Sequence, residues 1–273
     1  MNTSRSRHVF FCMLSTLIAC LIFSIVSNAQ EETSPLTKEK EKLSGKKKIK
    51  TCTGKIYNYE TNGSLSTIGT LYSLETFNHA GNIIQSILYS ANGEVADADQ
   101  FKYDSTQKFI AEMKQSPTVP MQKHIFHYKK NGQMEYGQVY MDTLLIHTCT
   151  YMYDANNRLS EVITRHHVAF EKNIPLQEVI FYEYDAKGNV IKDSDFEVEL
   201  NGTEIKNKKL ISETEYVYNA DSQLLQSTET NNKDCFSKIE FHYGADGTLS
   251  EELHYLNCGK KPDFALKYSY LYY

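Results

Sequence analysis

Apolar and polar positions along residues 51–273 follow the two-residue period of β-strands, interrupted at short intervals by turn-forming residues. Residues 238–243 alternate strictly, which predicts a strand buried on one face only. Residues 179–184 are apolar on both faces, so there we expect the sheet to curl over itself or to form a second layer. No segment of ten or more residues has the apolar period of a helix, so we expect little helix.

One short pattern recurs along this part of the chain. It reads aromatic, any residue, aromatic, Asp or Asn, two variable positions, Gly or a polar substitute, one further residue, then an aliphatic residue. The clearest copies are 151–159, 182–190, 216–224 and 241–249, and weaker ones begin at Tyr57, Phe77, Tyr89, Tyr103 and Phe126. The recurrence predicts a repeat protein.

Each copy predicts the tip of a β-hairpin. The Asp or Asn and Gly positions suit a tight turn with one left-handed residue, so Gly188 and Gly247 should have positive φ. One hairpin is marginal alone, so several must share a sheet. We therefore predict an all-β fold, an antiparallel meander of repeated β-hairpins forming a twisted, partly closed sheet. A β-sandwich is the alternative.

The copies starting at Tyr153 and Tyr184 match Tyr-Asp-x-x-Gly-x-Leu closely, with Asn157 in place of Gly in the first and Val190 in place of Leu in the second. The chain thereby resembles the YD-repeat proteins, such as Rhs proteins and teneurins, over nearly all of 51–273. The resemblance implies hollow shells around a cargo, often a C-terminal toxin, or adhesion at the cell surface. About nine hairpins are too few for such a shell, and we expect no cargo segment after Tyr273. The resemblance thus predicts a small exported repeat sheet.

The N-terminus has the order of a secretory signal. Arg5 and Arg7 precede an apolar run over 9–26, and Ser-Asn-Ala ends at Ala29, so we expect residues 1–29 to be removed before Gln30. Lipidation of Cys20 within Leu-Ile-Ala-Cys is one alternative, and an uncleaved anchor is another. The mature protein is then exported to the periplasm or cell surface, with no transmembrane segment after signal removal.

Residues 30–50 are rich in Lys and Glu and almost free of apolar residues, which predicts a disordered linker before the repeat domain, 51–273. Without signal and linker, 20 of the 29 basic and 30 of the 34 acidic residues remain. This net charge of about −10 is the wrong sign for a phosphate backbone, so we exclude nucleic acid as a partner.

Histidines and paired carboxylates are the first candidates for chemistry. His147 shares a face with Cys149 and two tyrosines, where we expect its imidazole to be hydrogen-bonded. The pairs His124/His127 and His166/His167 point to opposite faces of a strand and cannot chelate together, so we expect no metal site. The pairs Asp97/Asp99 and Asp193/Asp195 can each share a face as oxygen ligands for Ca²⁺, but we interpret them as solvated loop carboxylates.

Recognisable catalytic and cofactor motifs are absent from the sequence: it has no phosphate loop, nucleophile elbow or dinucleotide fingerprint. We therefore expect no enzyme activity, no catalytic residues and no cofactor. The 20 tyrosines are the remaining candidates, since exposed rings can stack on sugars or contact a peptide. We expect most of them to pack the sheet instead.

Four cysteines lie outside the signal, and an exported chain permits disulfides. Pairing Tyr243 with Leu249 leaves Cys235 and Cys258 one residue out of register. A single β-bulge would bring them opposite each other, so we predict a Cys235–Cys258 disulfide. Cys52 and Cys149 remain as a candidate second pair without a register argument.

These observations predict a non-enzymatic exported repeat module that binds a protein or a glycan at the bacterial envelope. The first alternative is a structural spacer or a subunit of a surface assembly. An enzyme with a dispersed active site is the second. Fold does not imply function, so the repeat itself leaves the ligand open.

Overall fold

The computed structural model describes residues 35–117, 119–167, 177–201, 204–231 and 234–273. The expected cleavage between Ala29 and Gln30, and the alternative lipidation of Cys20, fall outside these ranges. Contacts divide the chain into units 1–38 and 39–273, and all the strands belong to the second unit. Within the described residues, no helix is both long and apolar enough to cross a membrane.

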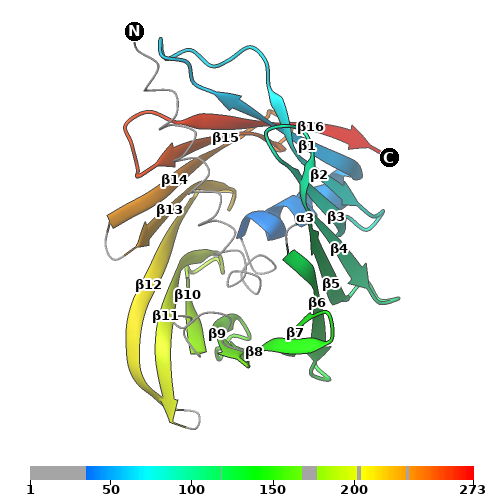
Figure 1. Ribbon diagram of the computed structural model, residues 1–273, viewed down its shortest axis with the longest axis vertical. Helices are drawn as coiled ribbons and strands as arrows, with labels where there is room; N and C mark the ends of the chain where they lie inside the picture. Colours follow the sequence, from blue (N-terminus) through cyan, green and yellow to red (C-terminus); the bar gives the residue numbers. More distant parts are fainter. Residues whose placement is uncertain (1–34, 118, 168–176, 202–203, 232–233) are drawn as a thin grey trace. The chain divides into compact units, whose positions relative to one another are not determined.

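The described residues form one helix and sixteen strands joined in sequence. They are α3 (Pro35–Lys47), β1 (Ile49–Asn58), β2 (Thr70–Phe77), β3 (Ile83–Tyr89), β4 (Val95–Tyr103), β5 (Phe109–Ser116), β6 (Val119–Tyr128), β7 (Met134–Met141), β8 (Leu144–Tyr153), β9 (Leu159–His166), β10 (Gln177–Tyr184), β11 (Val190–Asn201), β12 (Glu204–Tyr218), β13 (Leu224–Asn231), β14 (Asp234–Tyr243), β15 (Leu249–Leu256) and β16 (Phe264–Tyr272). Every strand pairs antiparallel with the next, and β1 pairs with β16. The ring of strands is visible in Figure 1.

The predicted all-β meander is therefore confirmed, but it closes into a barrel instead of stopping as a partly closed sheet, and no sandwich forms. Closure depends on β1 and β16, which lie at opposite ends of the repeat domain and pair from Ile49↔Tyr272 to Asn58↔Phe264. Pairing these two edges satisfies backbone groups that an open sheet would leave exposed.

All nine predicted tips are turns with the same hydrogen bonds in the described part of the chain. In one of them Gly188 N–H donates to the Asp185 carbonyl, and the Asp185 carboxylate accepts from the backbone amides of Lys187 and Asn189 at 2.8 and 2.9 Å. Gly188 and Gly247 have φ of 87° and 79°, as the turn pattern predicts. Seven turns join an even-numbered strand to the next, so they share one end of the barrel. These form the turn rim: the turns beginning at Asn78, Asp104, Lys129, Asp154, Asp185, Asn219 and Gly244.

Residues 35–47 are helical, so the predicted disordered linker over 30–50 is wrong for its described part. Pro35 begins α3 at a position that needs no backbone N–H, and Lys48, with φ of 56°, ends it in the left-handed conformation. Composition alone missed this helix because tertiary contacts of α3 with the barrel, described below, offset the ordering entropy.

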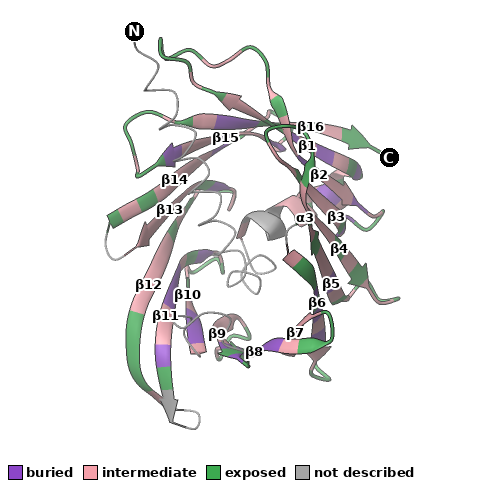
Figure 2. Cartoon of the chain, viewed as in Figure 1, coloured by how far each residue is buried: buried purple, intermediate pink, exposed green. Residues whose placement is uncertain are grey.

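Burial alternates along most strands and defines the two faces of the barrel (Figure 2). On β9, Val162, Thr164 and His166 are buried, whereas Arg165 between them is exposed. Cross-strand pairing continues this buried face from Tyr151 through Val162 and Ile180 to Asp195. In a closed barrel the continuous buried face is the inner wall.

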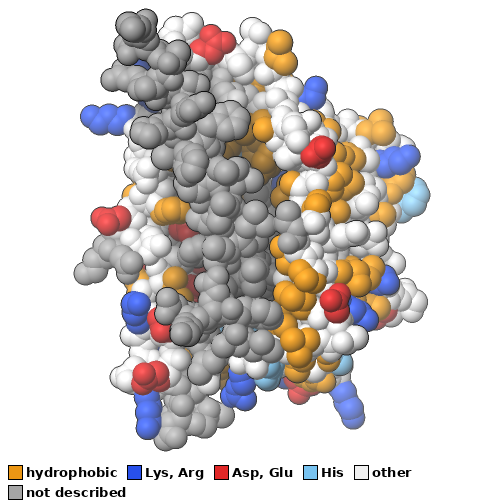
Figure 3. All heavy atoms as spheres, in the orientation of Figure 1, with side chains coloured by type: hydrophobic (Ala, Val, Ile, Leu, Met, Phe, Trp, Pro, Cys, Tyr) orange, Lys and Arg blue, Asp and Glu red, His pale blue; other side chains and the backbone are white. Residues whose placement is uncertain are grey.

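The opposite face carries ion pairs between neighbouring strands. Lys192 contacts Glu213 at 2.7 Å, and Lys267 contacts Glu251 at 3.3 Å. Charged side chains of both signs are interspersed with apolar ones over the visible described surface in Figure 3. The outer face thus carries ion pairs at mid-strand together with exposed apolar side chains such as Ile110 and Val217.

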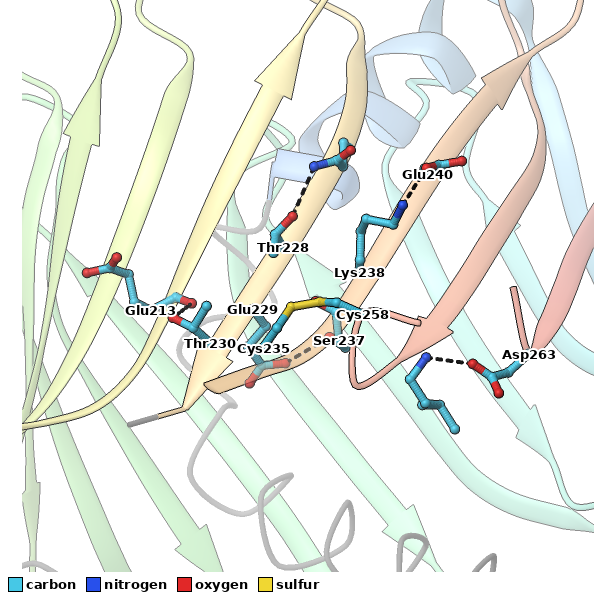
Figure 4. Close-up of a disulfide and its surroundings, with 12 residues drawn as sticks. Glu213, Thr228, Glu229, Thr230, Cys235, Ser237, Lys238, Glu240, Cys258 and Asp263 are labelled. Carbon is cyan, nitrogen blue, oxygen red and sulfur yellow. Dashed lines mark hydrogen bonds and ion pairs between the residues drawn. A yellow bond between two sulfur atoms is a disulfide. The ribbon is translucent and has the colours of Figure 1, made fainter. Parts of the chain in front are cut away.

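The final hairpin contains the predicted disulfide, Cys235–Cys258, with Cα atoms 5.7 Å apart (Figure 4). Tyr243 pairs with Leu249, and the next pair is His242↔Glu251, so a bulge lies where the register argument requires it. The remaining pairing hypothesis is wrong: Cys52 and Cys149 are both buried, and neither is joined in a disulfide.

Candidate functional site

Buried ionisable side chains gather on the inner wall of β8–β11. We call these five residues the histidine–carboxylate stripe: His147, His166, Glu178, Asp193 and Asp195. The strand period places them on one face, and antiparallel register places them on neighbouring strands: His147 pairs with His166, and Asp195 pairs with Ile180, two residues from Glu178. Residues up to 48 positions apart therefore share one surface.

The two histidines of the stripe meet edge to face. Their ring centroids are 4.4 Å apart with planes at 86°, and the exposed fractions are 4% for His147 and 7% for His166. Among the described residues, neither ring nitrogen of His147 has a hydrogen-bond partner. Burial, followed by the nearby His166 and His167, lowers the pKa of His147 to about 4. A neutral imidazole here offers one donor and one acceptor.

Of the carboxylates of the stripe, Glu178 lies nearest to His166. His166 Nε2 is 3.6 Å from Glu178 Oε2, too far for a direct hydrogen bond. Asp195 is 7% exposed, and its Oδ1 has no hydrogen-bond partner in the part of the chain that the structure describes. Burial is the main cause that raises the pKa of Asp195 to about 7, with further contributions from Glu178 and Asp193. The Tyr216 hydroxyl donates to Asp193 Oδ2 at 2.6 Å, which extends the polar wall to β12.

A second polar group, on β4–β6, includes a lysine. Lys114 lies between Asp99 and Glu112, at 3.9 and 3.5 Å, and Glu112 also contacts His124 Nδ1 at 3.2 Å. Burial lowers the pKa of His124 to about 3, followed by effects of Lys114 and His147. The contacts between Lys114 and these carboxylates account for the burial of the charged group inside the barrel.

Lys40 attaches helix α3 to the inner wall. Lys40 Nζ lies 3.0 Å from Glu75 Oε1 and 5.1 Å from the centre of the Tyr268 ring. Burial alone would lower the pKa of Lys40, but Glu75 and Glu252 outweigh it and raise the pKa. Glu252 also accepts from the Tyr268 hydroxyl at 2.7 Å. This charge group holds α3 inside the ring of strands seen in Figure 1.

At its C-terminal end α3 touches the turn rim. A Cβ on Gly81 would lie 2.1 Å from the Gly45 backbone nitrogen, so only glycine permits this approach. Lys47 contacts the Asp246 carboxylate at 2.9 Å. The helix is therefore secured at both the inner wall and the rim.

Two sequence interpretations are wrong at the stripe. His147 was expected to be hydrogen-bonded and is not, and Asp193 and Asp195 were expected in a solvated loop but lie buried in β11. Glu178 was missed altogether. The i, i+2 spacing of the two aspartates was the available signal, but a strand pattern alone does not tell an inner from an outer face.

The stripe can donate and accept hydrogen bonds through its buried polar atoms. Among the described residues, no group of three or more His, Cys, Asp or Glu side chains is placed to hold a metal ion. Instead, the stripe presents buried polar atoms that lack partners within the described chain. Such atoms are rare in folded proteins and need an explanation, because each costs free energy.

The fold and the stripe define an all-β barrel of sequential hairpins with a polar inner wall. A family model described as "Uncharacterised protein" matches residues 30–202, and the chain belongs to that family. No curated protein matches.

Three solved structures are similar at low identity. A chain of the TcdB2-TccC3 crystal structure is 17% identical with a TM-score of 0.34, covering 74% of this chain and 12% of that one. A chain of the Tc holotoxin pore of Photorhabdus luminescens is 15% identical with a TM-score of 0.31, covering 78% and 12%. A porin-like protein from Bacteroides uniformis is 11% identical with a TM-score of 0.34, covering 82% and 98%. The chain thus spans about an eighth of the first two, and none of the three carries a functional argument.

Proposed function

We propose that this protein is a non-enzymatic, exported module of the bacterial envelope that binds a glycan at the histidine–carboxylate stripe. The observation that carries the proposal is a set of buried polar atoms without hydrogen-bond partners within the described ranges: both ring nitrogens of His147, Nε2 of His166 and Oδ1 of Asp195. A ligand with hydroxyl groups supplies donors and acceptors together, which suits neutral imidazoles and a carboxyl group.

A glycan suits the stripe better than a folded protein does. The stripe faces the interior of a closed ring of strands, where a protein surface cannot approach the inner wall. The Tyr182 and Tyr216 side chains lie beside the aspartates, since Tyr182 pairs with Asp193 and Tyr216 donates to it. Carboxyl, imidazole and aromatic groups together are a common lining for polar small-molecule sites.

The proposal retains export and the YD-type repeat as parts of one hypothesis. The basic, apolar and small-residue order of the N-terminus supports export. The nine turns share the same backbone hydrogen bonds, and this supports the repeat resemblance. The Asp and Gly positions of the motif lie in these turns, as the motif implies.

Calorimetric titration with tetrasaccharides, both neutral and amine-bearing, tests the proposal. We expect binding by the unmodified chain and at least a tenfold loss for His147→Leu, because the variant lacks both ring nitrogens. We also expect His147→Leu to be more stable by about 1–3 kcal/mol, since it removes unpartnered buried atoms. Thr150→Ala, an exposed position on the same strand, should change neither quantity.

The structural alternative makes a different prediction for the same samples. If no tetrasaccharide binds while His147→Leu still raises the melting temperature, the stripe has no ligand. The proposal would then be wrong, and the role as a spacer or assembly subunit would take its place.

A further inference from the structure

The stripe on β8–β11 gathers buried carboxyl groups on neighbouring strands. Glu178, Asp193 and Asp195 are 3–7% exposed and lie on two adjacent strands. Within the described residues, neither Glu178 nor Asp195 forms an ion pair with a lysine or arginine, in contrast to Glu112, which contacts Lys114. Burying carboxylates without a cation is costly.

Resting on the proposed function, we infer that the bound glycan carries a free amino group, and that Glu178 and Asp195 bind its ammonium. An ammonium has three donors and no acceptor, so it complements carboxylate oxygens, including the unpartnered Oδ1 of Asp195. His147 and His166 then contact neighbouring sugar hydroxyls. The ligand class is thus an amino sugar rather than a neutral or N-acetylated one.

Proton linkage separates an ammonium ligand from a neutral one. The groups that face Asp195 are Glu178 on β10, Asp193 on β11 and Ser212, its partner on β12. With the pKa of Asp195 at about 7, the carboxyl group is largely protonated in mildly acidic solution. An ammonium requires the carboxylate, so its binding releases a proton and strengthens as the pH rises toward 7.

A matched pair of probes tests the inference with the full chain. The glucosamine tetrasaccharide and its fully N-acetylated form share one backbone and differ only in the amine. At about pH 6.5 we expect the amine form to bind at least tenfold more tightly, with proton release seen as a buffer-dependent binding enthalpy. Its affinity should rise by up to about tenfold between about pH 5.5 and 6.5, while that of the N-acetylated form stays constant.

Asp195→Asn should abolish the preference for the amine and its proton release. Glu183→Gln, which removes an exposed carboxylate on β10, should leave both unchanged. Equal or tighter binding of the N-acetylated probe, or a preference that survives in Asp195→Asn, would overturn the inference and leave glycan binding intact. If neither probe nor any neutral tetrasaccharide binds, the proposed function falls, and the inference falls with it.

Discussion

The Tyr184 hydroxyl donates a hydrogen bond of 2.6 Å to the backbone carbonyl of Leu159, at the start of the neighbouring strand. Leu159 is the aliphatic position of the preceding repeat copy. The tyrosine of one hairpin tip therefore binds the first residue of the strand that follows the preceding tip. The same bond recurs from Tyr103 to Ile83, Tyr218 to Val190, Tyr243 to Leu224 and Tyr270 to Leu249. This chain of bonds explains why the repeat uses Tyr, since Phe would pack equally but donate nothing.

Removal of one such bond should be measurable. Tyr184→Phe keeps the ring under Arg158, whose guanidinium lies 4.6 Å from the ring centre, and removes only the hydroxyl. We expect the free energy of unfolding to fall by about 1 kcal/mol, measured by urea denaturation. Tyr272→Phe, at an exposed position near the C-terminal end of β16, is the control and should change it little. Equal effects of both variants would contradict a specific role of the hydroxyl bond.

The cost of a substitution at Gly188, the left-handed turn position, should depend on how easily the new residue adopts a positive φ. No atom lies within 4 Å of a Cβ built on Gly188, so crowding plays no part there. Gly188→Val should cost about 1–2 kcal/mol through left-handed strain. Gly188→Asn should cost less, because Asn157 occupies the equivalent turn position with φ of 61°. Thermal melts in which Val and Asn behave alike would disagree with this explanation.

The disulfide of the last hairpin should stabilise the fold by restricting the unfolded chain. Cys235 and Cys258 close a loop with a sequence separation of 23. The double variant Cys235→Ser/Cys258→Ser should lose about 3 kcal/mol in the free energy of unfolding. Non-reducing peptide mapping should recover these two cysteines joined, and Cys52 and Cys149 alkylated only after unfolding. Recovery of any other pairing would refute the assignment.

Acidification should destabilise the barrel through its buried histidines. The pKa values of His124 and His147, about 3 and about 4, lie below the ~6.5 of an unfolded histidine. Between these values the unfolded chain binds protons that the folded chain does not. The stabilising contribution is therefore complete above about pH 6.5 and declines as the pH falls toward 4.

Asp195 acts with the opposite sign in the same range. Its folded pKa of about 7 exceeds the unfolded value of ~3.9, so the folded chain holds a proton that the unfolded chain has released. The effects of the two histidines exceed the opposite effect of the one aspartate. The free energy of unfolding should therefore fall by roughly 1.4 kcal/mol per pH unit as the pH decreases from about 6 to 4.5. Urea denaturation should show a flatter dependence for His147→Leu and a steeper one for Asp195→Asn. Identical slopes for the three proteins would contradict these assignments.

The sequence by itself determined the local structure of this protein. Turn chemistry depends on residues within five positions of each other, so the Asp and Gly spacing predicted all nine tips and the positive φ of Gly188. The register of a hairpin depends on its turn and on any bulge. Counting residues along both strands from the Tyr243–Leu249 pair was therefore sufficient to pair Cys235 with Cys258.

Only the tertiary structure decided which face of each strand lies inside. Closure pairs Ile49 with Tyr272, more than two hundred residues apart, and no local pattern encodes that contact. Closure makes one face of β8–β11 the inner wall of the barrel and so buries His147 and Asp195. The alternation of apolar and polar positions alone did not tell whether these residues lie on the inner or the outer face. Closure also places the Glu75 carboxylate in contact with Lys40 of α3. This contact orders α3, a polar segment whose composition predicts disorder. Burial and charge pairing depend on neighbours far along the chain, so they follow from the closed barrel and not from the repeat.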